Sequence, residues 1–189
     1  ISFNDLGPSP ERIPSVVLEP GASSAVELPS RAIAATGSSA AAVRIVADRP
    51  VLASQLSPLQ LDAGVDIGAT RLRPPHAAST TFRAVSRPAG ARILEFPAQR
   101  GFVVVVATRD GTQVSVTPSA TIDDGPAITG WGGGETRTFG LDAGQVFALF
   151  ATSPAGGPQR DLTGTLVRAD APVTVFSGHE QHAEGTDVE

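Results

Sequence analysis

The stretch of sequence that decides the fold is DLTGTLVRADAPVTVFSGHE, residues 161–180. Two β-rich runs, LTGTLV and PVTVF, lie on either side of a short polar turn, and the second run ends at Ser177-Gly178-His179-Glu180. Branched residues and threonines bounded by turn residues are typical of β-strands. We therefore expect a strand, a turn and a second strand here, all belonging to a sheet.

Comparable runs recur along the chain. Alternating or continuously apolar runs between turn signals predict strands at residues 15–18, 25–28, 42–47, 51–56, 80–85, 92–96, 102–108, 113–117, 136–141, 145–151, 162–168 and 173–177. Residues 102–106, FVVVV, are apolar on both faces and predict a central strand buried on both sides. Asp110-Gly111 then predicts a hairpin turn, because Asp-Gly readily supplies positive φ angles.

The predicted fold is all-β, in the form of an antiparallel β-sandwich. No apolar period near 3.6 residues continues for three helical turns. The 20 glycines and 16 prolines fit many short strands with tight connections. The loops at residues 59–75, 122–134 and 153–161 are long and rich in Gly, Pro and Asp, so we expect them to form the binding surface.

A faint internal repeat predicts two related sandwich units in tandem. LEPG at residues 18–21 matches LDAG at residues 141–144, and Ala-Asp-x-Pro-Val occurs at residues 47–51 and again at residues 169–173. Asp closes a turn in each copy, and Pro stands where the next strand begins. The glycines are 123 positions apart and the prolines 122, so the spacing is nearly constant.

The repeat also predicts where the units begin and end. Residues 1–4 should occupy the position that residues 114–117 hold in the second copy. Residues 1–98 would then form a first β unit that is incomplete at its N-terminal side, and residues 99–189 a second. A single continuous β domain is the alternative.

Composition limits the partners and the chemistry. A net charge of −5 without any basic cluster argues against binding nucleic acid through phosphates. No apolar run approaches the length of about eighteen residues that spans a bilayer. Without Cys there is no disulfide, thiolate metal site or cysteine nucleophile. All 14 positive side chains are Arg, a usage expected of a GC-rich bacterial genome. Because the chain begins at Ile1 without a leader, we expect it to be part of a longer protein.

Three blocks, residues 102–114, 141–147 and 161–180, together resemble the IgGFc-binding domain family, which recurs in bacterial surface proteins. DLTGT followed by PVxVFSGHE is the most distinctive part, and residues 43–56 look like the family's earlier strand pair. The family usually places a Cys shortly after the Gly-His, whereas here Glu180 leads into Gln181-His182.

The resemblance implies a non-catalytic module for adhesion or recognition, secreted or at the cell surface. Its partner would be an extracellular protein or glycoprotein, with IgG Fc indicated by family analogy alone, and no cofactor is expected. Two rivals remain open, namely a carbohydrate-binding sandwich and a structural spacer without a ligand.

Trp131, the single Trp, lies in a Gly-rich loop and is the first candidate contact residue. An exposed indole could stack on a sugar ring or a protein partner. The alternative is an indole that folds back over the sandwich edge as a plug.

The polar candidates are His179, Glu180, Asp123 and Asp124. His179 and Glu180 with His182 resemble a metal site, but they lack the helical HExxH spacing, and a turn His bonded to the backbone is the alternative. Asp123 and Asp124, with other turn aspartates, could supply oxygen ligands for Ca²⁺. The sequence lacks the DxDxDG spacing of a calcium loop, so we predict solvated turn aspartates and no metal site.

Ser177 near His179 also invites comparison with a hydrolase. There is no GxSxG elbow and no identifiable acid to orient the His. We therefore predict no catalytic residue and no enzyme activity.

Overall fold

The computed structural model describes residues 1–29, 31–57, 68–89, 100–154 and 157–180. Apart from one short 3-10 helix, Pro75–Ala77, the regular elements in these ranges are strands paired in antiparallel sheets, which confirms the predicted all-β class. The strands are β1 Ser2–Asp5, β2 Gly37–Ser39, β3 Val43–Val46, β4 Ser54–Ser57, β5 Gly68–Arg71, β6 Ser79–Arg83, β7 Gly101–Ala107, β8 Thr112–Thr117, β9 Arg137–Leu141, β10 Val146–Ala151 and β11 Leu166–His179. In the described part of the chain no helix has the length and apolarity needed to cross a bilayer.

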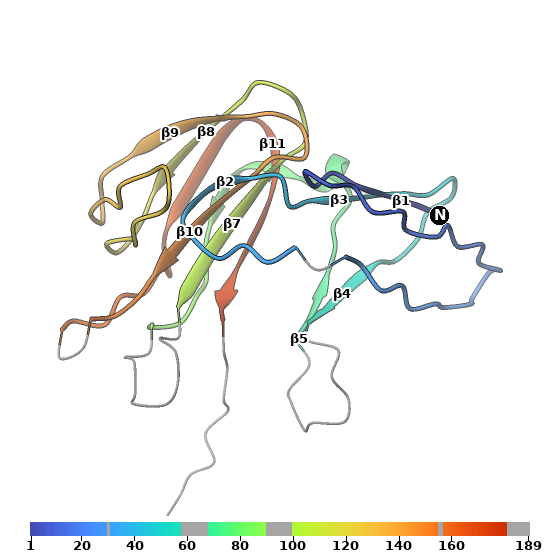
Figure 1. Cartoon of the computed structure of the whole chain (residues 1–189), viewed down its shortest axis with the longest axis horizontal. Coiled ribbons are helices and arrows are strands. Elements are labelled where there is room, and N and C mark those ends of the chain that lie inside the picture. The colour runs from blue at the N-terminus through green and yellow to red at the C-terminus, as the bar shows by residue number, and fades with distance from the viewer. Residues whose placement is uncertain (30, 58–67, 90–99, 155–156, 181–189) are drawn as a thin grey trace, which may run out of the picture.

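The main sheet has seven strands and curls into a half-barrel (Figure 1). Its strand order is β2-β10-β7-β11-β8-β9, and β6 pairs with the free edge of β11. One curled sheet therefore takes the place of the two packed sheets expected for a sandwich.

The long strand β11 gives the sheet its curl. Its first part, residues 166–169, pairs with β8, and its second part, residues 173–179, pairs with β7. Pro172 has no N–H to donate. It lies between the two ladders, where no hydrogen bond to a neighbouring strand is needed. The two strands predicted within residues 161–180 are thus one bent strand, and the Ala-Asp-Ala-Pro segment is its bend instead of a turn.

The predicted hairpin after β7 is wrong, although the turn is present. Gly111 has a φ of 68°, as expected for Asp-Gly. Yet β7 pairs with β10 and β11, while β8 pairs with β11 and β9, so β7 and β8 follow one another in the same direction along β11. The turn carries the chain from one part of the curled sheet to the other.

Three bends meet in a crease across the main sheet. They are residues 108–111 between β7 and β8, residues 142–145 between β9 and β10, and residues 169–172 within β11. Backbone bonds join the first two bends, because Ala107 donates to Gln145 O over 3.0 Å and receives a bond from Gly144 N over 2.9 Å. The crease is therefore a fixed part of the architecture.

The hydrophobic core lies against one face of the curled sheet. β7 contributes Val103 and Val105, both fully buried, while its other face is only half-buried. The prediction that this strand is central is confirmed, since β7 lies between β10 and β11, but the predicted burial on both sides is wrong, because the residues of its second face are only half-buried. Leu149 of β10 and Val167 of β11 are also fully buried. The remaining core residues are Ala84, Ala107, Val114, Val116, Ile122, Trp131, Leu141, Phe147, Ala151, Leu162 and Val173.

The N-terminal part of the chain lies beside the main sheet in two small sheets, β1–β3 and β4–β5 (Figure 1). Of the strands predicted here, residues 25–28 have no strand conformation, and residues 15–18 pair only through Ile1 and Val16. Predicted strand 92–96 lies outside the described residues. The division into tandem units at residues 98 and 99 stays a prediction.

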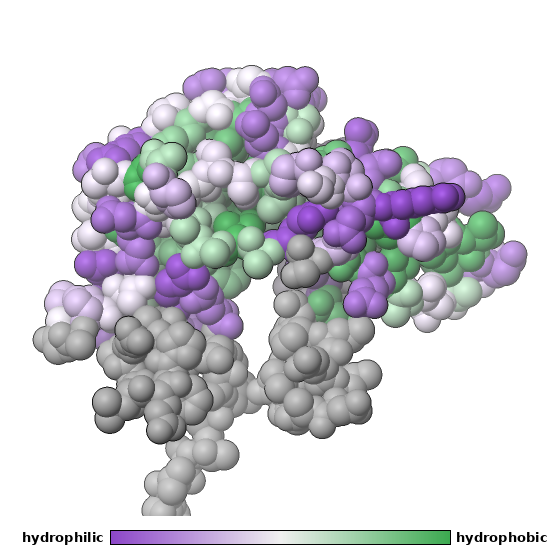
Figure 2. Space-filling model, viewed as in Figure 1, coloured by the Kyte–Doolittle hydropathy of each residue, from purple (hydrophilic) through white to green (hydrophobic). Residues whose placement is uncertain are grey.

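This N-terminal part leaves apolar side chains on its surface, visible as green areas at the right of the space-filling view (Figure 2). The exposed large apolar residues within residues 1–57 are Leu6, Val17, Leu28, Val46, Val51, Leu52 and Leu56.

Candidate functional site

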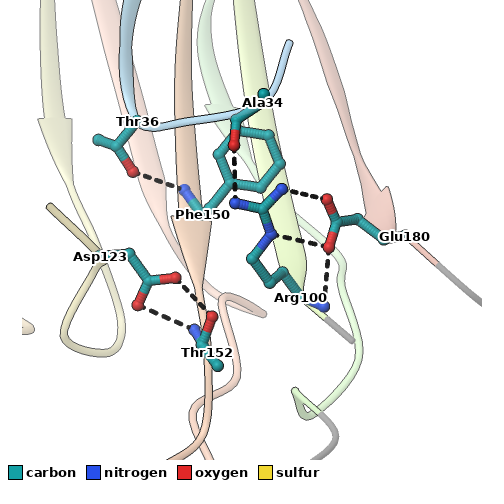
Figure 3. Close-up of polar contacts among 7 residues, drawn as sticks. All are labelled: Ala34, Thr36, Arg100, Asp123, Phe150, Thr152 and Glu180. Atoms are coloured by element: carbon teal, nitrogen blue, oxygen red, sulfur yellow. Dashed lines mark hydrogen bonds and ion pairs between the residues drawn. The ribbon is translucent and has the colours of Figure 1, made fainter. Parts of the chain in front are cut away.

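The candidate site lies at the end of the main sheet where β7 begins and β11 ends. Arg100 and Glu180 pair there as extensions of the two neighbouring strands (Figure 3). Arg100 Nε donates to Glu180 Oε2 over 2.8 Å, and Arg100 Nη2 donates to the other carboxylate oxygen. The backbones bond as well, since Glu180 N–H donates to Arg100 O over 2.9 Å. The result is a bidentate ion pair between two residues whose backbones are fixed by the pairing of β7 with β11.

The Arg100 guanidinium has two further contacts. Nη1 donates to Ala34 O over 2.9 Å, and the guanidinium carbon lies 4.1 Å from the centre of the Phe150 ring (Figure 3). Its side chain is 24% exposed and that of Glu180 is 31% exposed, so both groups face solvent while their geometry is fixed. The hydrogen bonds to Glu180 raise the pKa of Arg100 above its ordinary value, so it stays charged at any physiological pH.

A shallow depression of about 280 Å³ lies next to this pair, at the end of β11. Val85 is 71% exposed there and supplies an apolar surface. Ser86 Oγ donates to Gly178 O over 2.8 Å and so ties the segment after β6 to the end of β11. The depression is lined by Val85, Ser86, Arg87, Gly178 and His179. We call the Arg100–Glu180 pair, Phe150 and this depression the end face.

Asp123 belongs to the same end of the sheet, where it anchors a loop. Its carboxylate accepts from Thr152 N over 3.1 Å and from Thr152 Oγ1 over 2.6 Å (Figure 3). Arg160 Nη1 adds a bond of 3.2 Å to the same carboxylate. The carboxylate oxygens that sequence reasoning offered to a metal are therefore bonded within the protein.

Asp124 lies next to Asp123 and closes the loop on itself. Its Oδ1 accepts from Gly130 N over 2.7 Å, and Ile122 N donates to Trp131 O over 3.1 Å. A β-carbon at Gly130 would collide with the carbonyl of Ile122, so the close approach requires glycine. The conformation of the loop at residues 122–131 is therefore fixed by hydrogen bonds within the loop itself.

The Trp131 side chain lies in the core and is 3% exposed. Its Nε1 donates to Glu135 O over 3.0 Å, and its ring lies 5.7 Å from that of Phe139. The guanidinium carbon of Arg137 lies over the indole, 4.8 Å from the ring centre. This placement matches the plug that was the alternative interpretation, and a role of Trp131 in ligand contact stays a prediction.

The structure thus brings Glu180, His179 and Asp123 to one end of the sheet and leaves Trp131 apart in the core. His182 lies outside the described residues. Among the residues that the structure describes, no three His, Asp or Glu side chains gather into a possible metal site. Ser177 Oγ accepts from Val85 N over 3.3 Å, so its hydroxyl helps to hold the segment after β6.

Sequence reasoning missed Arg100, Phe150 and Val85. Arg100 lies two residues before the FVVVV run, and a charged residue just before a central strand could have indicated a polar site at that end of the sheet. Its partner Glu180 is 80 residues away, so only the pairing of β7 with β11 makes the contact predictable.

Comparison with families of known proteins gives one match. The model of a family described as IgGFc binding protein matches residues 68–188, which is more than half of the 189 residues. The match begins at β5, so it leaves out residues 43–56, which the sequence resemblance had included. No curated protein and no solved structure matches the chain.

Proposed function

We propose, from the premise that this chain belongs to the IgGFc-binding protein family, that it is a non-enzymatic recognition module with a protein partner. The family match over residues 68–188 is the observation that carries the proposal. The family's description makes the Fc part of IgG the first partner to propose. We place the module outside the cell, in a secreted or surface protein of a bacterium, where it would serve adhesion.

The end face is the contact surface that we propose. Protein interfaces combine an apolar centre with a polar rim. Val85, at 71% exposure, supplies the apolar centre, and the Arg100–Glu180 pair supplies the rim. Because Arg100 is already fixed by Glu180 and Ala34, little side-chain freedom remains to be lost on binding.

Interferometry with the immobilised chain tests this function. We expect saturable binding of an Fc fragment and no binding of the Fab fragment of the same antibody. Val85→Asp should weaken Fc binding by about tenfold or more, because it places a charge at the centre of the contact. Val17→Asp is the matched control, since Val17 is 91% exposed elsewhere and its replacement should leave the affinity unchanged. Absence of Fc binding, or equal loss in both variants, would contradict the proposal.

A spacer without a ligand is the second candidate. Two observations favour it, namely the burial of Trp131 at 3% exposure and the internal pairing of Asp123 with Thr152 and Arg160. A spacer would bind neither Fc nor other extracellular proteins and would bind nothing on a glycan array. Binding to the array with no binding to proteins would favour the carbohydrate-binding alternative.

A further inference from the structure

Residues 1–57 repeat the strand pairing of the main sheet. In the β1–β3 ladder Phe3 pairs with Ile45, and in the β8–β11 ladder Val116 pairs with Val167. Ile45 and Val167 are 122 positions apart, the same spacing as the two prolines of the sequence repeat. Phe3 takes the place of Val116, as expected if residues 1–4 correspond to residues 114–117.

The third strand position corresponds as well. Ile1 and Val16 exchange two backbone hydrogen bonds, of 2.8 and 2.9 Å. Their counterparts are Val114 of β8 and Phe139 of β9, which form a pair in the main sheet. The segment around Val16, β1 and β3 therefore lie side by side in the same order as β9, β8 and β11.

The two turns that follow have the same conformation. Gly21 and Gly144 both have a φ of 82°. In the first turn Ala22 N donates to Glu19 O over 3.0 Å, and in the second Gln145 N donates to Asp142 O over 2.9 Å. Two pairings and a turn thus correspond between the copies. The spacing is 122 residues for Ile45 and 123 for Val16 and Gly21, whereas it is 113 for Ile1 and Phe3.

The correspondence ends at the strand after the turn. In the second copy this strand is β10, which pairs with β7 and is buried at every position. Its counterpart, residues 23–28, has no backbone hydrogen bond to another described segment. Within the described residues no strand takes the position of β7 beside residues 23–28.

Side chains that the second copy buries are exposed in the first. Ala151 is fully buried, whereas its counterpart Leu28 is 39% exposed. Val173 is fully buried, whereas its counterpart Val51 is 46% exposed, and Leu52 beside it is 70% exposed. By this correspondence, Leu28 on one side and Val51 with Leu52 on the other flank the position that β7 fills between β10 and β11 in the main sheet.

We infer that residues 23–28 form an acceptor edge for an extended apolar strand of a partner protein. The occupant has the chemistry of β7, Gly-Phe-Val-Val-Val-Val-Ala, because β7 sits at the corresponding position of the second copy. Backbone bonds to residues 23–28 supply the pairing, and alternate apolar side chains cover Leu28 and Val51, whose counterparts Ala151 and Val173 are fully buried. Since residues 1–57 lie outside the family match, the inference does not depend on the proposed function.

Hydrogen exchange of the full chain, with a peptide of residues 100–109 (RGFVVVVATR) as the probe, tests the acceptor edge. We expect exchange at residues 23–28 to slow by about tenfold or more when the peptide is added. The same peptide with prolines at its first and third Val positions cannot form the ladder and should give no protection. Val51→Asp should abolish the protection, whereas Val17→Asp, at an exposed apolar position away from the edge, should preserve it.

Two outcomes would overturn the inference. One is unchanged exchange at residues 23–28 in the presence of the peptide, with both variants folded as judged by circular dichroism. The other is protection of residues 23–28 that grows with protein concentration in the absence of peptide, because the occupant would then be a second copy of this chain.

Discussion

Asp110 and Asp142 each accept a hydrogen bond from the bend that carries the other. Asp110 Oδ1 receives Ala143 N–H over 3.0 Å, and Asp142 Oδ1 receives Gly111 N–H over 2.9 Å. A third carboxylate, Asp170, receives Gln113 N–H over 2.9 Å. The three bends of the crease are thus fastened by aspartates that accept from backbone donors. These side chains have a structural role in holding the curl of the sheet.

The reciprocal bonds predict coupling between Asp110 and Asp142. Each single replacement by Ala should lower the free energy of unfolding by about 1 kcal/mol, because it leaves one backbone donor without its acceptor. The double variant should lose less than the sum, since both bonds hold the same pair of bends. Urea denaturation measures all three values. Asp48→Ala, at an exposed position outside the crease, is the control, and strict additivity would contradict the coupling.

Glycine replacements test the turn of the crease. Gly111→Ala should lower the free energy of unfolding by about 1 kcal/mol, because Gly111 has a φ of 68° and an alanine is strained there. An added β-carbon would meet no atom within 4 Å, so the backbone angle alone is tested. Gly132→Ala is the matched control, since its surroundings are equally open and its φ is not positive. Equal stability of the two variants would contradict this reading of the turn.

The Asp5–Arg31 pair predicts a dependence of stability on pH. Hydrogen bonds from Arg31, with those from Glu11 N and Gly7 N, hold the pKa of the Asp5 carboxyl well below its usual range. The stabilisation is therefore complete above the unfolded value of about 3.9 and is lost as the pH falls toward the folded-state pKa.

Asp5→Asn removes this contribution. The difference in unfolding free energy between the natural chain and the variant should be largest near neutral pH and should shrink below about pH 4. Denaturation at a series of pH values measures it. A difference that stays constant down to pH 2.5 would show that the carboxylate charge has no role.

Trp131 offers a direct optical test, because it is the single Trp of the chain. At 3% exposure its emission should be blue-shifted, and iodide should quench it far less than a free indole. Trp131→Phe should lower the free energy of unfolding by about 1–3 kcal/mol, through the lost bond to Glu135 O and lost packing. Quenching as efficient as that of free indole would restore the exposed platform that the Gly-rich loop suggested.

Local patterns in the sequence marked the strands of the main sheet except the short edge strand β2, Gly37–Ser39, which was not predicted. The FVVVV run marked β7, and the alternating run after Asp110-Gly111 marked β8, because burial of one face sets a period of two. What these patterns could not give is the partner of each strand. β7 and β8 are joined by a turn typical of hairpins, yet both pair with β11, whose partner residues lie 49 or more positions further along the chain.

The candidate site was less predictable for the same reason. Glu180 was selected from the family-like segment, but its function as the partner of Arg100 depends on a contact across 80 residues. Trp131 was selected because glycines surround it, and the structure shows that those glycines allow the loop to fold the indole into the core. The correspondence of residues 1–4 with residues 114–117, which the short sequence repeat suggested, stays a prediction.

The measurement that tests the central claim most directly is hydrogen exchange of the full chain with and without a saturating Fc fragment. If the chain recognises Fc through the end face, exchange should slow in residues 84–89, 100–102 and 178–180, and Val85→Asp should abolish the effect. Unchanged exchange in all three segments, or protection confined to other surfaces, would contradict the proposed function and its site.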